Sequence, residues 1–99
     1  MTYARMTTFQ ADPSKVEEGI RFAREQALAP IRQQSGFQGM RLLVDRQSGK
    51  MIAVTLWETE AAARDAGSAL SQTRTQATQL VGAASPTTEM FEMVVNENA

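Results

Sequence analysis

The sequence predicts a single α+β domain, residues 1–99, with the βαββαβ order of a ferredoxin-like fold. Three observations support this fold class: a central hairpin signal, an amphipathic helical segment on each side of it, and strand-like alternation near both ends. Strands are expected at residues 3–9, 37–46, 50–58 and 89–95, and helices at residues 13–34 and 60–81. This order predicts a four-stranded antiparallel sheet with both helices on one face.

The central hairpin is the strongest local signal. Two strand-like runs flank Gln47, Ser48 and Gly49, and Gly49 is expected to adopt the left-handed conformation that a tight turn requires. The even-numbered residues in the middle of both runs are apolar, so we expect them to share the face that packs under the helices. These residues are Met40, Leu42, Val44, Ile52, Val54 and Leu56.

The first helix has clear start and interruption signals. Asp12 is a suitable N-cap and Pro13 suits the first helical position. Pro30 is expected to kink or end the helix near Leu28, with a short continuation to Gln34. Its apolar stripe comprises Val16, Ile20, Ala23, Ala27 and Ile31.

The second helix begins with Thr59 as its expected N-cap, and its inner side chains are mostly small. A helix with such a stripe must approach the sheet closely or leave a cavity above it. Residues 71–79 are polar and rich in Thr, so we expect a bent or frayed region there. The expected stripe is Ala62, Ala66, Ala69, Leu70, Thr73, Ala77, Leu80 and Val81.

The composition excludes several kinds of site. The chain contains no Cys and no His, which removes Cys/His zinc sites, Ser-His-Asp and Cys-His nucleophiles, and a histidine ligand to haem. A formal charge of −1 does not favour nucleic acid or membrane as a partner. No signal-peptide or membrane-span pattern is visible, so we expect a complete cytoplasmic protein with no metal and no cofactor.

The sheet face opposite the helices is expected to be unusually apolar. The predicted pattern places Phe91, Met93 and Val95 of the last strand there, with Leu43, Met51 and Trp57 of the hairpin. A monomer rarely leaves so much apolar surface in water. We therefore expect a partner on this face, and the simplest one is a second copy of the chain.

Two local motifs carry a resemblance to a known family. Gly36-Phe37-x-Gly39 and the strand-to-helix junction Val54-Thr-Leu-Trp57-Glu58-Thr59 resemble the antibiotic biosynthesis monooxygenase family, a group of dimeric α+β barrels. The resemblance extends over residues 3–95. It implies a homodimer whose two sheets face each other, with a pocket in each subunit between sheet and helices.

The resemblance also sets expectations about chemistry. Members include cofactor-independent oxygenases acting on polycyclic phenols and quinols, haem-degrading enzymes, and small proteins of unknown role. The haem-degrading branch uses a His on the second helix and an Asn on the first strand, and this sequence has neither. Trp57 alone occupies a matching position.

Five residues are candidates for the pocket. Trp57 and Thr55 would form its wall, with the indole N–H as a donor to a ligand oxygen, or Trp57 is a packing residue of the core or dimer interface. Arg5 and Arg41 would orient an anionic substrate, or form salt bridges with Asp45 or Glu89. Glu92 would act as a base of raised pKa, or lies solvated at the sheet end.

The sequence thus favours a cofactor-independent monooxygenase-like protein that binds a small apolar aromatic compound. Such a site would deprotonate an acidic phenol and hold the resulting carbanion near dioxygen in a dry pocket. Without His, the base for this step is unassigned, so whether the protein is an enzyme stays open. The alternative is a non-catalytic small-molecule-binding or stress-response protein of the same dimeric barrel fold.

Overall fold

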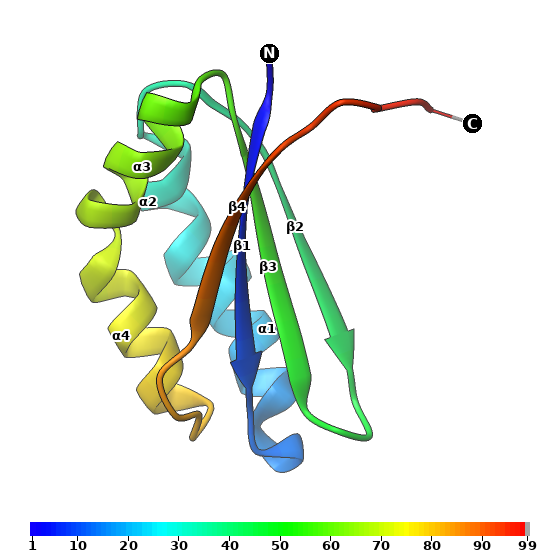
Figure 1. Cartoon of the computed structure of the whole chain (residues 1–99). Helices are drawn as coiled ribbons and strands as arrows, with labels where there is room; N and C mark the ends of the chain where they lie inside the picture. Colours follow the sequence, from blue (N-terminus) through cyan, green and yellow to red (C-terminus); the bar gives the residue numbers. More distant parts are fainter. Residues whose placement is uncertain (99) are drawn as a thin grey trace.

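The computed structural model describes residues 1–98, which form one sheet with a helical layer on one face (Figure 1). The four-stranded antiparallel sheet has the order β2-β3-β1-β4. This arrangement confirms the predicted ferredoxin-like fold. The elements are β1 Tyr3–Gln10, η1 Pro13–Lys15, α1 Val16–Phe22, η2 Ala23–Ala27, α2 Leu28–Arg32, β2 Phe37–Asp45, β3 Lys50–Trp57, α3 Glu60–Ala69, α4 Ser71–Leu80 and β4 Thr87–Glu92.

The first helical segment of this layer starts, and is interrupted just before Leu28, as its sequence predicts. The Asp12 carboxylate accepts the Ser14 backbone N–H at 2.9 Å, which caps η1, with Pro13 in its first turn. The helix then continues through α1, η2 and α2 and ends at Arg32. Its one irregularity, the π-helical turn η2, immediately precedes the turn that contains Pro30. Because proline has no backbone N–H, the regular series of i→i−4 hydrogen bonds must be interrupted at this turn.

The second helical segment of the layer consists of two helices rather than one. The Thr59 hydroxyl accepts the Ala62 N–H at 3.0 Å, so the predicted N-cap of α3 is confirmed. The chain bends at Leu70, with φ −104° and ψ 14°, and the polar segment that follows forms the regular helix α4. The predicted inner stripe was wrong at two positions, because Ala69 and Leu80 are exposed. The buried residues here are Ala63, Ala66, Gly67, Leu70 and Val81.

The pairing of the hairpin corrects the predicted faces of β3. Asp45 pairs with Lys50, so the turn holds four residues, and even-numbered residues of β2 lie beside odd-numbered residues of β3. Met51 and Trp57 are therefore under the helices, with 4% and 0% of their surfaces exposed. The expectation that Ile52, Val54 and Leu56 face the helices was wrong, since a one-residue change in register turns every side chain over.

A β-bulge changes the faces again at the start of β2. Phe37 pairs with Trp57 but Gly39 pairs with Leu56, so β2 contains one extra residue between the two pairs. Phe37 consequently lies on the helical side of the sheet. Its ring packs edge-on against Trp57 with the ring centroids 5.6 Å apart.

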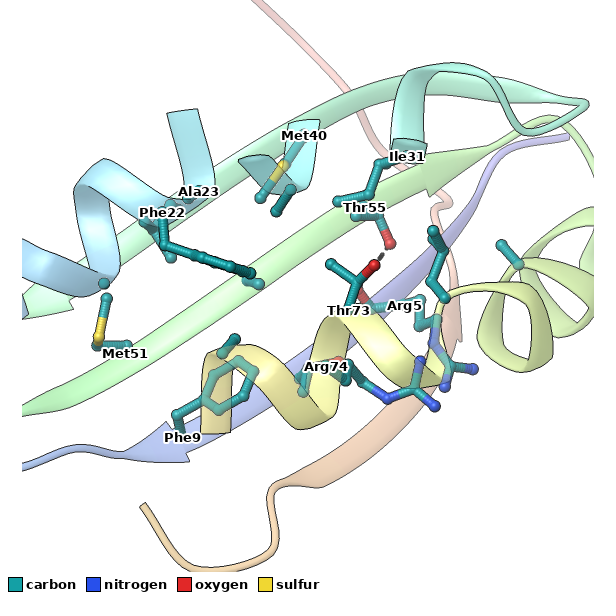
Figure 2. Close-up of a pocket in the computed structure, with 18 of the residues that line it drawn as sticks. Arg5, Phe9, Phe22, Ala23, Ile31, Met40, Met51, Thr55, Thr73 and Arg74 are labelled. Atoms are coloured by element: carbon teal, nitrogen blue, oxygen red, sulfur yellow. Dashed lines mark hydrogen bonds between the residues drawn. The ribbon is translucent and has the colours of Figure 1, made fainter. Parts of the chain in front are cut away.

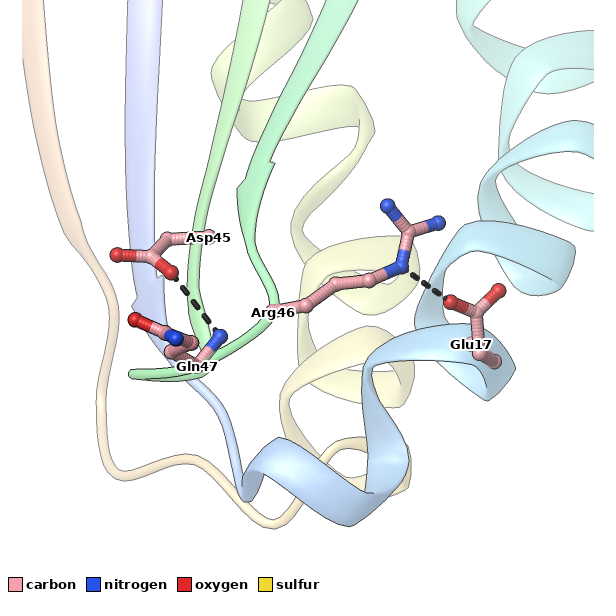
Figure 3. A network of polar contacts seen from close by, with 4 residues as sticks. All are labelled: Glu17, Asp45, Arg46 and Gln47. Atoms are coloured by element: carbon pink, nitrogen blue, oxygen red, sulfur yellow. Dashed lines mark hydrogen bonds and ion pairs between the residues drawn. The ribbon is translucent and has the colours of Figure 1, made fainter.

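The far end of the hairpin is held by polar contacts on the protein surface (Figure 3). The Asp45 carboxylate accepts the Gln47 N–H at 3.0 Å, and Arg46 Nε lies 2.6 Å from Glu17 Oε1 on α1. Gly49 has φ +82°, as the turn requires, and its carbonyl accepts the Ala11 N–H at 2.9 Å. These contacts join the hairpin turn to the start of the first helix.

The sheet face opposite the helices carries exposed apolar side chains. Leu43 is 55% exposed and Phe91 is 47% exposed, which confirms two members of the expected open face. The last strand ends at Glu92, earlier than expected; the Met93 N–H still donates to the Thr2 carbonyl at 2.8 Å, and the chain after it extends away from the sheet (Figure 1). Among residues 1–98 no helix has the length and hydropathy needed to cross a membrane.

Candidate functional site

A cavity of about 100 Å³ lies between the helical layer and the sheet (Figure 2). It exists because the helices place small residues over the centre of the sheet. The small-residue stripe was expected either to bring the helix close to the sheet or to leave a cavity, and the structure has the cavity. The small residues above it are Gly19, Ala23, Ala27, Ala66 and Ala77. The larger apolar residues around it are Phe9, Phe22, Ile31, Met40, Leu42, Met51, Trp57, Leu70 and Val81.

Trp57 and Thr55 form a hydrogen-bonded pair in the cavity wall. The Trp57 indole N–H donates to Thr55 Oγ1 at 2.9 Å, and the indole is fully buried. The Thr55 hydroxyl in turn donates to the Arg5 backbone carbonyl at 3.5 Å, which is a long bond. The indole N–H is therefore occupied within the protein, and the threonine hydroxyl is the group of this pair that can turn toward a ligand.

Two arginines line the side of the cavity that lies against α3 and α4. Arg5 comes from β1 and Arg74 from α4, and their guanidinium groups are directed to the same region (Figure 2). Arg5 also lies tightly against Gly67 of α3, where an added Cβ would come within 2.6 Å of Arg5 Cζ. Partial burial, followed by the positive charge of Arg74, lowers the pKa of Arg5 from its ordinary value.

The structure brings together three of the five residues that the sequence indicated. Trp57, Thr55 and Arg5 all line the cavity. Arg41 is exposed on the other face of the sheet, where its Nη1 donates to the Met40 carbonyl at 3.0 Å. Glu92 is exposed at the end of β4, opposite Tyr3. The cavity lining described for residues 1–98 contains neither Arg41 nor Glu92.

Sequence reasoning did not select Arg74, which lies in the segment expected to be bent or frayed. A usable signal was present, because Arg74 follows Leu70 by four residues and precedes Ala77 by three. Those spacings place the three residues on one helical stripe. Leu70 and Ala77 also line the cavity, as this stripe predicts.

The polar groups of the cavity are hydroxyls and guanidinium groups. Thr7, Thr55 and Thr73 supply the hydroxyls, and Arg5 and Arg74 the positive charge. Within residues 1–98, no carboxylate, lysine or tyrosine lines the cavity, and no group of three His, Cys, Asp or Glu side chains gathers as a metal site would need. This wall can enclose an apolar body and stabilise negative charge, but it offers no side chain with the properties of a general base.

A four-stranded antiparallel sheet with one helical layer and an apolar cavity between the layers defines a small α+β protein able to enclose a compact ligand. The sequence model of the antibiotic biosynthesis monooxygenase family matches residues 2–78. The chain belongs to this family, as the motifs around Gly36 and Trp57 indicate.

Curated relatives with similar sequences come from Mycobacterium tuberculosis. The uncharacterized protein Rv2558 is 44% identical over 64 residues, which is 65% of this chain and 27% of the relative. The uncharacterized protein Rv2557 is 33% identical over 93 residues, which is 94% of this chain and 41% of the relative. The chain therefore spans less than half the length of these relatives.

Solved structures show the same fold. A monooxygenase from Streptomyces coelicolor, ActVA-Orf6 in complex with nanaomycin D, has a TM-score of 0.81 at 17% identity, over 98% of this chain and 91% of that chain. SnoaB, a cofactor-independent oxygenase from Streptomyces nogalater, has a TM-score of 0.68 at 23% identity, over 96% and 95% of the two chains.

Proposed function

We propose that this protein is a cofactor-independent, monooxygenase-like protein that binds a small apolar aromatic compound of the phenol or quinol type. The observation that carries the proposal is the apolar cavity of about 100 Å³ with Trp57, Thr55 and Arg5 in its wall. The family and the ligand-bound Streptomyces coelicolor monooxygenase of the same fold support a ligand role for this space.

The size of the cavity limits the ligand. A buried apolar cavity of about 150 Å³ is known to hold benzene. A cavity of about 100 Å³ is smaller than that, so a single ring is the largest body that it could take with small side-chain adjustments, and a polycyclic ligand would require the helical layer to move outward. The bend at Leu70, where α3 and α4 meet over the cavity, is the place at which this layer is already interrupted.

In the proposed reaction, an electron-rich phenol and O₂ give a quinone and water. The phenol loses its O–H proton, and the ring carbon carries the resulting charge to O₂. One oxygen atom replaces the ring hydrogen and becomes the new carbonyl, and the other leaves as water with both hydrogens. The substrate supplies all the electrons. The positive charge of Arg5 would favour the phenolate, so that its proton passes to solvent rather than to a side chain.

The assembly and location form part of the same proposal. We propose that residues 1–99 act as one domain, that two copies pair through their open sheet faces, and that the homodimer is cytoplasmic. Leu43 and Phe91 are the exposed apolar side chains that such pairing would cover. Neither nucleic acid nor membrane has a role in this proposal.

A second candidate function is binding without chemistry. The observation that favours it is the absence of carboxylate, lysine and tyrosine side chains from the cavity lining described for residues 1–98. A binding or stress-response protein would need the apolar enclosure but no proton acceptor.

Oxygen uptake with a panel of single-ring and polycyclic quinols separates the two functions. The enzyme proposal expects uptake above the uncatalysed rate that falls at least tenfold in Trp57→Phe and Arg5→Ala. Arg21→Gln, an exposed charge change on α1, serves as the matched control and retains the full rate. Saturable quenching of Trp57 fluorescence without uptake would support the binding function instead. If the panel produces no oxygen uptake and no quenching, both candidate functions are contradicted.

A further inference from the structure

The guanidinium groups of Arg5 and Arg74 occupy the cavity edge without a carboxylate to neutralise them. The salt bridges found among residues 1–98 are Arg46–Glu17 and Arg64–Glu60, and neither involves Arg5 or Arg74. Two like charges held close together, both of them partly buried, repel each other in the folded state, and an anion bound between them would relieve this repulsion. This arrangement therefore requires an explanation beyond packing.

The space around the two arginines is rich in donors. A second, more open hollow shares Arg5 and Arg74 with the lining of the cavity, and its lining residues are Arg5, Arg64, Gly67, Ser68, Ser71 and Arg74. Arg64 is held by Glu60 one helical turn away, so its charge is already matched. The positive charge available to a ligand is that of Arg5 and Arg74, at the place where the apolar cavity meets solvent.

Gly67 is the feature that allows Arg5 to reach this position. A Cβ at residue 67 would lie 2.6 Å from both Cζ and Nη1 of Arg5, closer than atoms approach without movement. Glycine is otherwise a poor choice inside a helix, because it lowers helix stability relative to alanine. Its presence in α3 fits a requirement to seat the guanidinium against the backbone.

We propose that Arg5 and Arg74 bind the carboxylate of a single-ring aromatic acid whose apolar body fills the cavity. This inference rests on the proposed ligand-binding function and names the ligand class. Each guanidinium presents a planar fork of donors that matches the two oxygens of a carboxylate, whereas a phenolate offers a single oxygen. The cavity then supplies the apolar enclosure, and the hollow supplies the charge at its entrance.

The test is a titration monitored by the fluorescence of Trp57, the only tryptophan in the chain. The probes are 4-ethylbenzoate, its uncharged isostere 4-ethylbenzamide, and 4-ethylphenol. The benzoate is expected to bind at least about tenfold more tightly than the amide, since a charged hydrogen-bonding partner typically contributes this much. Arg74→Gln is expected to remove that preference, and Arg21→Gln, the matched charge control on α1, to retain it.

The variant Gly67→Ala tests whether the position of the Arg5 guanidinium matters when the charges of Arg5 and Arg74 are unchanged. It keeps both arginines, and alanine favours the helix, so the melting temperature is expected to be unchanged or higher. Displacement of the Arg5 guanidinium is nevertheless expected to reduce the benzoate preference at least about fivefold. A variant that melts as the wild type does and loses the preference cannot be explained by misfolding.

Three outcomes would overturn the inference. Equal binding of all three probes, unchanged in the variants, contradicts the carboxylate site and leaves the proposed ligand-binding function standing. A preference for 4-ethylphenol over the benzoate contradicts the carboxylate assignment alone. Failure of every probe to bind contradicts this inference and the proposed single-ring ligand together.

Discussion

Trp57 packs in the core and also forms part of the cavity wall, and its indole N–H is hydrogen-bonded within the protein. Its indole N–H donates to Thr55 Oγ1 at 2.9 Å in a fully buried setting. Thr55→Val keeps the side-chain shape but leaves this donor without its acceptor. We expect the free energy of unfolding to fall by about 1–3 kcal/mol, measured by urea denaturation.

A double-mutant cycle identifies the cause of this loss. Phenylalanine has no N–H, so Thr55→Val should cost at least about 0.5 kcal/mol less in a Trp57→Phe background than in the wild type. Equal costs in the two backgrounds would mean that the hydrogen bond contributes nothing to the stability of the wall.

Asp45 makes the hairpin end sensitive to acid. Hydrogen bonds from the backbone of Gln47 and then of Ser48 hold the pKa of the Asp45 carboxyl below its ordinary value. A carboxyl with a lowered folded pKa contributes stability above its unfolded pKa, about 3.9, and loses it as the pH falls through the folded pKa. Asp45→Asn should therefore show a smaller loss of stability between about pH 5 and pH 2 than the wild type.

Urea denaturation at several pH values checks this prediction. Some acid sensitivity will persist, because hydrogen bonds from Ser14 and Arg46 lower the pKa values of Asp12 and Glu17 in the same way. If the free energy of unfolding falls with decreasing pH as steeply in Asp45→Asn as in the wild type, the stability of the turn does not depend on this carboxylate.

The candidate site was partly readable from single residues. Trp57 could be selected as the one tryptophan, at a strand end, and Arg5 as a cationic side chain of odd-numbered strand parity that could orient an anion. Arg41 resembled Arg5 in type, but the far side of the sheet was not distinguishable from the near side without the register. Arg74 lies in a part of the predicted second helix that was expected to be bent or frayed because of its threonine content, so its side chain was not assigned to the pocket.

At the level of elements, the hairpin turn depends on the absence of a side chain at Gly49. A Cβ there would collide with the Ala11 carbonyl oxygen, and the residue also has φ +82°. Gly82 has a similar φ of +69°, but its nearest neighbour to an added Cβ is 3.7 Å away. Gly82→Ala should cost about 1–2 kcal/mol from the left-handed backbone alone. Gly49→Ala should cost about 3 kcal/mol or more, because the collision is added.

Thermal unfolding of the two variants measures the difference directly. Equal destabilisation would mean that Ala11 moves away without cost, and that the contact between the hairpin turn and the start of the first helix contributes little.

The order and type of the elements followed from periodicity and capping, but the faces of β3 did not. The predicted turn had three residues, whereas the structure has four. The shorter turn placed Ile52 on the helical face of the sheet and Trp57 on the open face, and the structure reverses the two. A turn length is decided by backbone hydrogen bonds that apolar alternation does not report. The bulge before Gly39 could not be predicted from the sequence either, since one extra residue does not change the kinds of residue that a strand contains.

For the whole molecule, the open sheet face gives a direct test of assembly. Leu43→Lys places a charge within the proposed dimer contact and should convert the dimer to a monomer in light scattering after size-exclusion chromatography. Leu80→Lys is the matched control, because Leu80 is also exposed but lies on α4, away from this face. A wild-type monomer, or a dimer lost equally in both variants, would contradict pairing through the sheet.

The cavity also determines how the folded protein responds to hydrostatic pressure. The cavity of about 100 Å³ adds to the internal void volume that is eliminated on unfolding, and the volume decrease on unfolding scales with that void volume. Compression should therefore unfold the free protein more easily than a fully packed domain of the same size. An occupant that fills the space removes this volume difference, so resistance to pressure reports occupancy even for a compound with no colour and no fluorescence.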